Sequence, residues 1–167
     1  MKRTYFEIAE RVWKTLAHIL AFMLMALIVI VFWQIFCRYV IKASNGWTQE
    51  ISTLVFIWAT YLGAALAIRS GAQISVRVIV NKFKGPLHEI IELIAAIICE
   101  VFYFVFSIAG ILAMYIFVGV GTPALRMSMA IPYSAIAVSG IIMIFFGIDE
   151  IIKPVKKIMN NRKSKEV

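Results

Sequence analysis

The sequence has little charge and few of the residues that carry metal or redox chemistry. Only 16% of its 167 residues are charged, and it contains two cysteines and two histidines. Soluble proteins are about 25% charged and about 45–50% apolar, whereas this chain is 62% hydrophobic. With a mean hydropathy of +0.91, the chain is expected to have lipid as its main solvent, which excludes a large soluble enzyme domain.

The scarcity of cysteine and histidine excludes several kinds of cofactor. Cys37 and Cys99 fall toward opposite faces of the membrane, beyond the ~7 Å Cα separation that a disulfide allows. A membrane cytochrome needs facing imidazoles inside the bilayer, but only His18 falls within an apolar run. The string from His88 to Glu92 lacks the second histidine of a zinc-protease helix. We find no nucleophile with a base and no phosphate loop, so we expect neither an enzyme nor a bound metal or cofactor.

Four apolar runs predict an all-α integral membrane protein with four transmembrane helices. A bilayer core needs about 20 helical residues. The expected spans are residues 16–36, 51–68, 90–118 and 131–148, within a single membrane domain of residues 1–167. The third run is longer than a bilayer needs, so it should tilt or project into the cytoplasm.

The basic residues predict how the chain is oriented. Fourteen of the seventeen lie in the N-terminal segment, in the second loop and in the C-terminal tail, and the other three are Arg38, Lys42 and Arg126. Because lysine and arginine are enriched in cytoplasmic loops, we expect both termini in the cytoplasm. Basic residues placed between apolar runs suit the anionic membrane lipids of the inner leaflet, whereas nucleic-acid binding would need a polar basic domain.

The segment between the second and third spans, residues 73–84, is too short to cross a bilayer but too apolar for a free loop. As a helix it would line one side with Val76, Ile79, Val80 and Phe83. We therefore expect an amphipathic interfacial helix lying flat on the inner leaflet. Its β-branched residues would also allow a strand, but a lone strand at a membrane surface leaves its backbone unpaired.

Two further patterns single out candidate residues inside the spans. Ala59, Gly63 and Ala67 recur at four-residue spacing, which favours close packing against another helix, in this chain or in a partner subunit. Glu89, Glu92 and Glu100 fall within an arc of about 80° and form an acidic stripe. Glu100 is the deepest, where an ionised carboxylate is costly unless it is paired or hydrated. The stripe predicts either pairing with basic residues near the cytoplasmic interface or proton coupling through Glu100.

Several strings of the sequence resemble a known family. They are Arg38-Tyr39-Val40, Trp47-Thr48-Gln49-Glu50, Phe56-Ile57-Trp58, Leu62-Gly63-Ala64-Ala65 and Ala67-Ile68-Arg69-Ser70-Gly71-Ala72-Gln73-Ile74, with looser matches in Thr122-Pro123-Ala124-Leu125 and Ile131-Pro132-Tyr133. Together these strings resemble the small membrane subunit of tripartite ATP-independent periplasmic (TRAP) transporters. The family commonly has an acid where Gln49 stands and a histidine where Gln73 stands, so roles cannot be transferred to these two positions.

The resemblance implies a scaffold subunit of a sodium-coupled secondary transporter in the bacterial inner membrane. Its partners would be a large multi-span membrane subunit that holds the substrate and sodium sites and moves like an elevator, and a periplasmic binding protein. The binding protein would deliver an organic acid such as a dicarboxylate or a sialic acid. The alternative is a self-sufficient small exporter, an oligomer that exchanges protons through Glu100.

Three residues of the resembling strings fall at the expected outer face. Trp47 suits the membrane interface, and Glu50 would complement the dipole of the second helix near its N-terminus. Arg38 lies across the same short loop, so we expect it to pair with Glu50 and fix the hairpin. Direct contact with the binding protein is the other interpretation of this outer hairpin motif.

Overall fold

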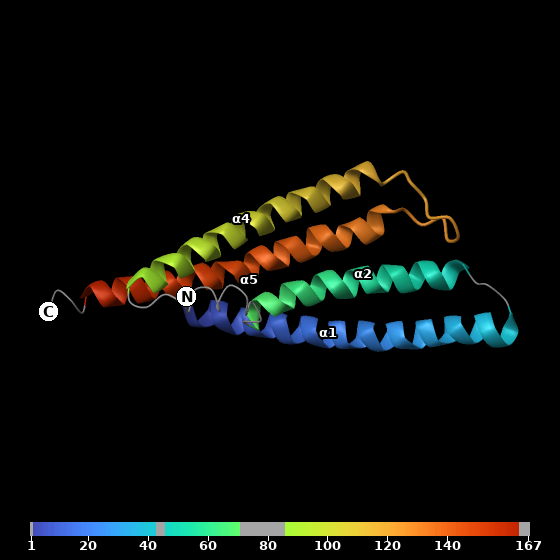
Figure 1. Cartoon of the computed structure of the whole chain (residues 1–167), viewed down its shortest axis with the longest axis horizontal. Coiled ribbons are helices and arrows are strands. Elements are labelled where there is room, and N and C mark those ends of the chain that lie inside the picture. The colour runs from blue at the N-terminus through green and yellow to red at the C-terminus, as the bar shows by residue number, and fades with distance from the viewer. Residues whose placement is uncertain (1, 43–45, 71–85, 164–167) are drawn as a thin grey trace.

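The computed structural model describes residues 2–42, 46–70 and 86–163, and four long helices make up nearly all of them (Figure 1). The helices are α1 (Lys2–Phe36), which continues into the π-helical turn η1 (Cys37–Ile41), α2 (Gly46–Arg69), α4 (Pro86–Ile116) and α5 (Ala130–Lys163). Each helix contains a stretch that is long and apolar enough to cross a bilayer. The predicted all-α, four-span fold is therefore confirmed. The interfacial segment 73–84, with its predicted apolar side, lies outside the described residues.

The local sequence explains where the helices begin and end. α1 runs for 35 residues because neither glycine nor proline interrupts it. The helical path stops at Lys42, which adopts a left-handed conformation with φ 55° and donates its backbone N–H to the carbonyl oxygen of Cys37. α4 begins at Pro86, whose fixed φ and missing N–H suit a first helical turn. Each helix extends beyond at least one end of its expected span because polar residues there continue the same backbone hydrogen bonding, whereas α4 ends at Ile116, two residues before the expected end.

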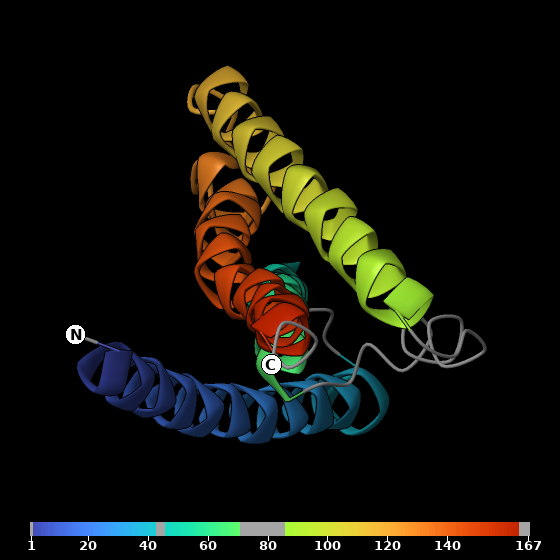
Figure 2. The ribbon, with the colours of Figure 1, turned by 90° about the vertical axis from the view of Figure 1, so that its left-hand side faces the viewer.

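The helices form an open row and do not close into a four-helix bundle. α1 packs against α2, α2 against α5, and α5 against α4. Viewed from one end, α1 and α4 lie on opposite sides of the α2–α5 pair (Figure 2). None of the most apolar stretch of α1 is buried, and Phe22 is 75% exposed on this helix. The two edge helices therefore present long apolar faces to whatever surrounds the protein.

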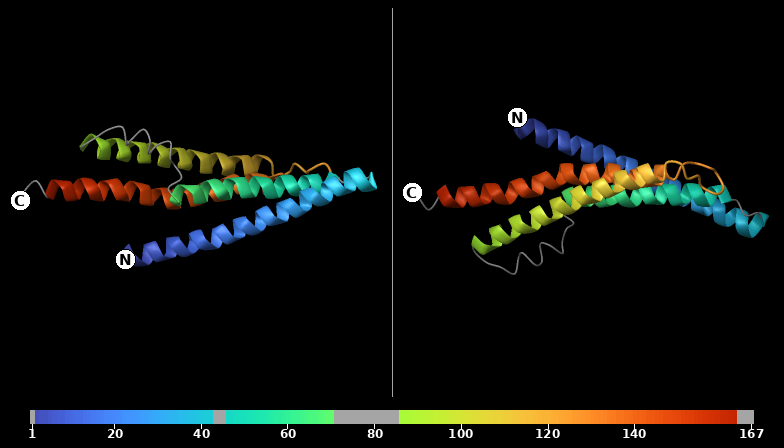
Figure 3. Two further views of the ribbon diagram at one scale, coloured as in Figure 1. Left: turned by 60° about the horizontal axis from the view of Figure 1, so that its bottom comes forward. Right: turned by 90° about the horizontal axis from the view of Figure 1, so that it is seen from above.

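Both chain termini lie at the same end of the row, here called the termini end (Figure 1). η1 and the loop of residues 117–129 lie at the opposite end, called the loop end. α1 runs at an angle to α5, so the two termini are separated although they share one end (Figure 3). An even number of crossings is the arrangement that allows both termini to lie on the same side of a membrane.

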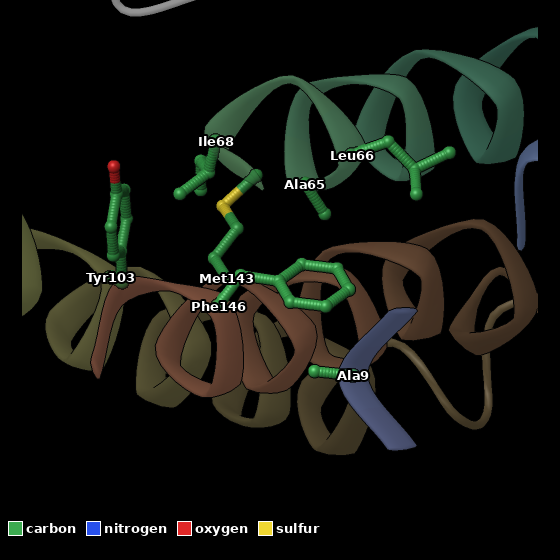
Figure 4. Packing of buried hydrophobic residues seen from close by; sticks show 7 residues of the cluster. All are labelled: Ala9, Ala65, Leu66, Ile68, Tyr103, Met143 and Phe146. Carbon is green, nitrogen blue, oxygen red and sulfur yellow. The ribbon is translucent and has the colours of Figure 1, made fainter. Parts of the chain in front are cut away.

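All four helices contribute to one buried cluster near the termini end (Figure 4). Its buried members are Ala9 of α1, Ala65, Leu66 and Ile68 of α2, Tyr103 of α4, and Met143 and Phe146 of α5. In lipid the hydrophobic drive between helices is weak, so van der Waals packing of this kind holds them together. The cluster joins all four helices, and a contact between the rings of Tyr61 and Phe106, with centroids 5.8 Å apart, also connects α2 with α4.

The backbones of α4 and α5 approach each other closely at two glycines. A Cβ atom added at Gly110 would lie 2.6 Å from the backbone nitrogen of Ala137, and one added at Gly140 would lie 2.8 Å from the Cα of Ser107. No side chain fits at such separations. Ser107, which faces Gly140 across this seam, is also buried. The seam therefore depends on small residues of both helices.

Candidate functional sites at the two ends of the row

The loop of residues 117–129 is an ordered cap at the loop end. Its two arms exchange backbone hydrogen bonds from Thr122 N to Met127 O (2.8 Å) and from Met129 N to Val120 O (2.8 Å). Arg126 turns the chain with a positive φ of 53°. The Ser128 hydroxyl donates to the carbonyl of Val118 and accepts from the backbone N–H of Ala130, where α5 begins. The loop is thus fixed to both helices that it connects.

Glu50 of α2 fastens this loop to the second helix. One carboxylate oxygen accepts the backbone N–H of Ala124 at 2.6 Å, and the other accepts the N–H of Leu125 at 2.9 Å. Two consecutive N–H groups that converge on one carboxylate form a charge-assisted, bidentate contact. The structure therefore brings together two of the strings that carried the family resemblance, Trp47-Thr48-Gln49-Glu50 and Thr122-Pro123-Ala124-Leu125.

The expected pairing of Arg38 with Glu50 is wrong. α2 begins at Gly46, before the expected span, so Glu50 lies beyond the first turn and its carboxylate points to the 117–129 loop. Arg38 lies exposed on η1 and forms no ion pair with Glu50. The two helices are linked instead by a hydrogen bond between the side-chain amides of Gln34 and Gln49. Trp47 is half-exposed at the start of α2, as an interfacial indole would be.

A pocket of about 370 Å³ lies beneath the ordered loop, between α2 and the first turns of α5. Its walls are mostly apolar and include Leu54, Ile57 and Tyr61 of α2 and Ile136 of α5. Glu50 and Thr122 stand at its rim. The Glu50 carboxylate is held by loop N–H groups, and the rest of the lining is mostly apolar, so the pocket is best suited to an apolar group.

The termini end contains an ion pair that joins the two halves of the chain. Arg69 Nη1, at the end of α2, donates to Asp149 Oδ2 of α5 at 3.1 Å, and the two side chains are only 14% and 19% exposed. The Arg69 guanidinium also lies 5.6 Å from the centre of the Phe146 ring, a cation–π contact. The Trp13 indole N–H donates to the carbonyl of Leu66 at 3.3 Å and ties α1 to the same level.

Glu100 lies next to this ion-pair level, in the seam between α4 and α5. Its Oε2 atom packs against Gly147, two residues before Asp149, and is buried without a hydrogen-bond partner. The part of α4 that precedes Glu100 therefore projects beyond the end of α2, as Figure 1 shows. Glu92 lies half-buried two turns earlier, whereas the side chain of Glu89 lies outside the described residues.

The predicted small-residue face of α2 lies partly against α1. Ala59 is buried, and a Cβ atom added at Gly63 would lie 3.6 Å from Cδ2 of Leu20, an ordinary van der Waals separation. Ala67 is half-buried near the end of the helix. Gly63 therefore has room for a methyl group, and its closest neighbour belongs to the same chain.

Sequence reasoning missed two of these features. It did not pair Arg69 with Asp149, because the two residues are 80 positions apart and a charge at the end of a span was read only as a boundary. It did not single out Gly110 and Gly140, although the nearby serines were a detectable signal of small residues in both helices. Among the described residues, no group of three or more histidine, cysteine or acidic side chains is placed to hold a metal ion.

The four long apolar helices define a multi-pass α-helical membrane protein. The polar contacts at the loop end and at the termini end connect its helices. Residues 27–157 match the family model described as the DctQ component of tripartite ATP-independent periplasmic transporters. The match covers most of the chain, so the chain belongs to this family. Membership and the four helices of transmembrane length indicate a multi-pass protein of the bacterial inner membrane.

Two curated proteins extend the comparison. The chain is 38% identical over 77 residues to a Haemophilus influenzae protein named as a TRAP transporter small permease, covering 41% of the chain and 48% of that relative. It is 26% identical over 102 residues to the C4-dicarboxylate TRAP transporter small permease protein DctQ of Rhodobacter capsulatus, covering 59% of the chain and 44% of that relative. The matching part of the chain thus spans about half the length of these relatives.

Proposed function

We propose that the chain is the scaffold subunit of a sodium-coupled secondary transporter that takes up organic acids. In this proposal a large, elevator-type membrane subunit carries the substrate and sodium ions, and a periplasmic binding protein delivers the substrate. The observation that carries the scaffold role is the open row of helices, which exposes long apolar faces on α1 and α4. A row widens the membrane anchor of a complex more than a closed bundle of the same four helices would.

The substrate class rests on the relatives. The Rhodobacter capsulatus protein is named for C4-dicarboxylates, and the sequence resemblance extends to transporters of sialic acids. A direct test reconstitutes the chain in proteoliposomes with its large subunit and binding protein, and follows uptake of labelled succinate or sialic acid under an inward sodium gradient. Sodium-driven uptake by the full complex, together with none by the chain alone, is the expected result. Uptake at the same rate with and without the sodium gradient would contradict sodium coupling.

The orientation is a separate part of the proposal. We place the termini end in the cytoplasm because fourteen of the seventeen basic residues of the sequence belong to segments on that side. The loop end, with Glu50 and the ordered loop, then faces the periplasm. Fusions of a cytoplasm-active and a periplasm-active reporter at Met1 and at Val167 test this arrangement. Periplasmic activity at either terminus would overturn it.

The second candidate function is the self-sufficient proton-coupled exporter. The observation in its favour is Glu100, an intramembrane carboxylate with an unpartnered buried oxygen. Reconstituting the chain alone discriminates the two candidates, because an exporter needs no large subunit. Transport by the chain alone that Glu100→Gln abolishes would support the exporter and contradict the scaffold.

A further inference from the structure

Glu100 is a carboxylate that the described part of this chain does not neutralise. Its Oε2 atom is fully buried and accepts no hydrogen bond. The nearest atoms across the seam belong to Gly147, with the ring of Tyr103 beside it on the same helix. The neighbouring cation, Arg69, donates instead to Asp149, two residues further along α5. A carboxylate in this setting is costly unless a donor reaches it.

The surroundings of Glu100 are open to a second molecule. Val101, the next residue of α4, is 58% exposed, and Ile148, which follows Gly147 on α5, is 41% exposed. Glu100 as a whole is half-buried, whereas its Oε2 atom is covered, so a donor from a second molecule reaches this oxygen only if the neighbouring side chains move aside. Because α4 is an edge helix of the row, an approaching membrane segment meets no other described helix of this chain on that side.

The charges at this level explain what kind of group would fit. Arg69 and Asp149 neutralise each other, whereas an ionised Glu100 would add one negative charge, and no ion pair joins Glu100 to another described residue. We propose that Glu100 receives a lysine or arginine side chain from a membrane-embedded segment of the large partner subunit. The inference rests on the proposed scaffold function and adds to it the edge of the row, α4 with α5, at which the partner docks.

The proposal predicts that one substitution has opposite effects on the isolated chain and on the complex. In Glu100→Gln the shape of the side chain is kept, but its charge is lost. The isolated chain loses an unpaired buried charge, so it should melt in detergent at the same or a higher temperature than the wild type. In the complex the partner's cation loses its counter-charge, so the affinity for the large subunit should fall by about tenfold or more.

The experiment co-expresses each variant with the large subunit of its transporter and measures both co-purification and the dissociation constant in detergent. Glu10→Gln is the matched control, because Glu10 pairs with Lys14 of its own helix at 2.9 Å and should change neither quantity. Glu100→Lys places two cations together and should abolish the complex.

Three outcomes decide the matter. Wild-type affinity of the Glu100→Gln variant for the large subunit overturns this inference while leaving the scaffold function in place. A lower melting temperature of the isolated Glu100→Gln chain also overturns it, because the carboxylate would then have an internal or lipid partner. Failure of the wild-type chain to assemble with any large subunit overturns the scaffold function, and this inference with it.

Discussion

The two helical hairpins of the chain are packed by different means. In the α4–α5 hairpin the backbones approach so closely that Gly110 and Gly140 leave no space for a side chain. In the α1–α2 hairpin Gly63 keeps an ordinary separation from Leu20, and most of α1 remains exposed. A glycine in a membrane helix therefore does not by itself indicate close packing. The distance between the helices also depends on the residue that faces the glycine. The α4–α5 hairpin is the more closely packed of the two, while α1 and α4, the edge helices of the row, both keep exposed apolar faces.

Arg69 and Asp149 join these two hairpins, and breaking that ion pair should have the largest effect. Arg69→Met leaves Asp149 buried without its cation, so the free energy of unfolding should fall by about 3 kcal/mol. Unfolding in mixed micelles by a denaturing detergent measures this quantity. The double variant with Asp149→Leu should recover most of the loss, because two apolar side chains can replace a buried pair. A loss below about 0.5 kcal/mol would instead indicate an ion pair screened by water.

The tight hairpin should be the more sensitive of the two to a single methyl group. Gly140→Ala places a Cβ atom against the backbone of Ser107, so the helices must separate, at a cost of about 1–3 kcal/mol. The same detergent titration measures it, with crosslinking between cysteines introduced on α4 and α5 as a check of their spacing. Wild-type stability of Gly140→Ala would show that the seam can relax and would remove the contrast between the hairpins.

The fastening of the loop to α2 predicts a local effect. Glu50→Ala removes the acceptor for the N–H groups of Ala124 and Leu125, so hydrogen exchange at these two amides should rise to the rate of an exposed loop. Exchange within the helices should not change. Gln49→Ala, which affects only the amide link to Gln34, is the matched control. Unchanged protection at Ala124 and Leu125 would show that the loop holds its shape without Glu50.

The smallest effect is expected at Gly63. Gly63→Ala adds a methyl group where an ordinary contact with Leu20 is available, so stability should change by no more than about 0.5 kcal/mol, in either direction. It is the same chemical change as Gly140→Ala, which makes the two variants a direct comparison of the hairpins. A loss as large as that of Gly140→Ala would contradict the looser packing assigned to α1 and α2.

The helices could be predicted from the sequence because their signal is local. Long uncharged runs need no knowledge of neighbours: three of the expected spans fall inside helices of the structure, and the third, 90–118, ends two residues beyond α4. The order of the helices in space could not be predicted, because apolar side chains face lipid and protein alike and leave no contrast between buried and exposed sides. For this reason the sequence of α1 did not indicate that most of its surface would be exposed.

The polar contacts were harder to predict because they depend on pairs far apart in the chain. Glu50 was singled out, but its partner was misassigned to the nearest cation, Arg38, when two backbone N–H groups of the 117–129 loop satisfy it. A search for oppositely charged side chains does not consider backbone N–H groups as partners. Glu100 was singled out by its depth alone, and its position beside Gly147 required the packing of α5 against α4.

The row of helices also has a consequence for how the chain enters the membrane. Each hairpin buries its main interface between helices that are consecutive in the chain, so each can form soon after its second helix leaves the ribosome. Arg69 and Asp149, by contrast, are 80 residues apart. Arg69 therefore remains without this partner during the synthesis of α4 and of α5 up to Asp149, whereas the contact of Glu50 with Ala124 and Leu125 can form earlier.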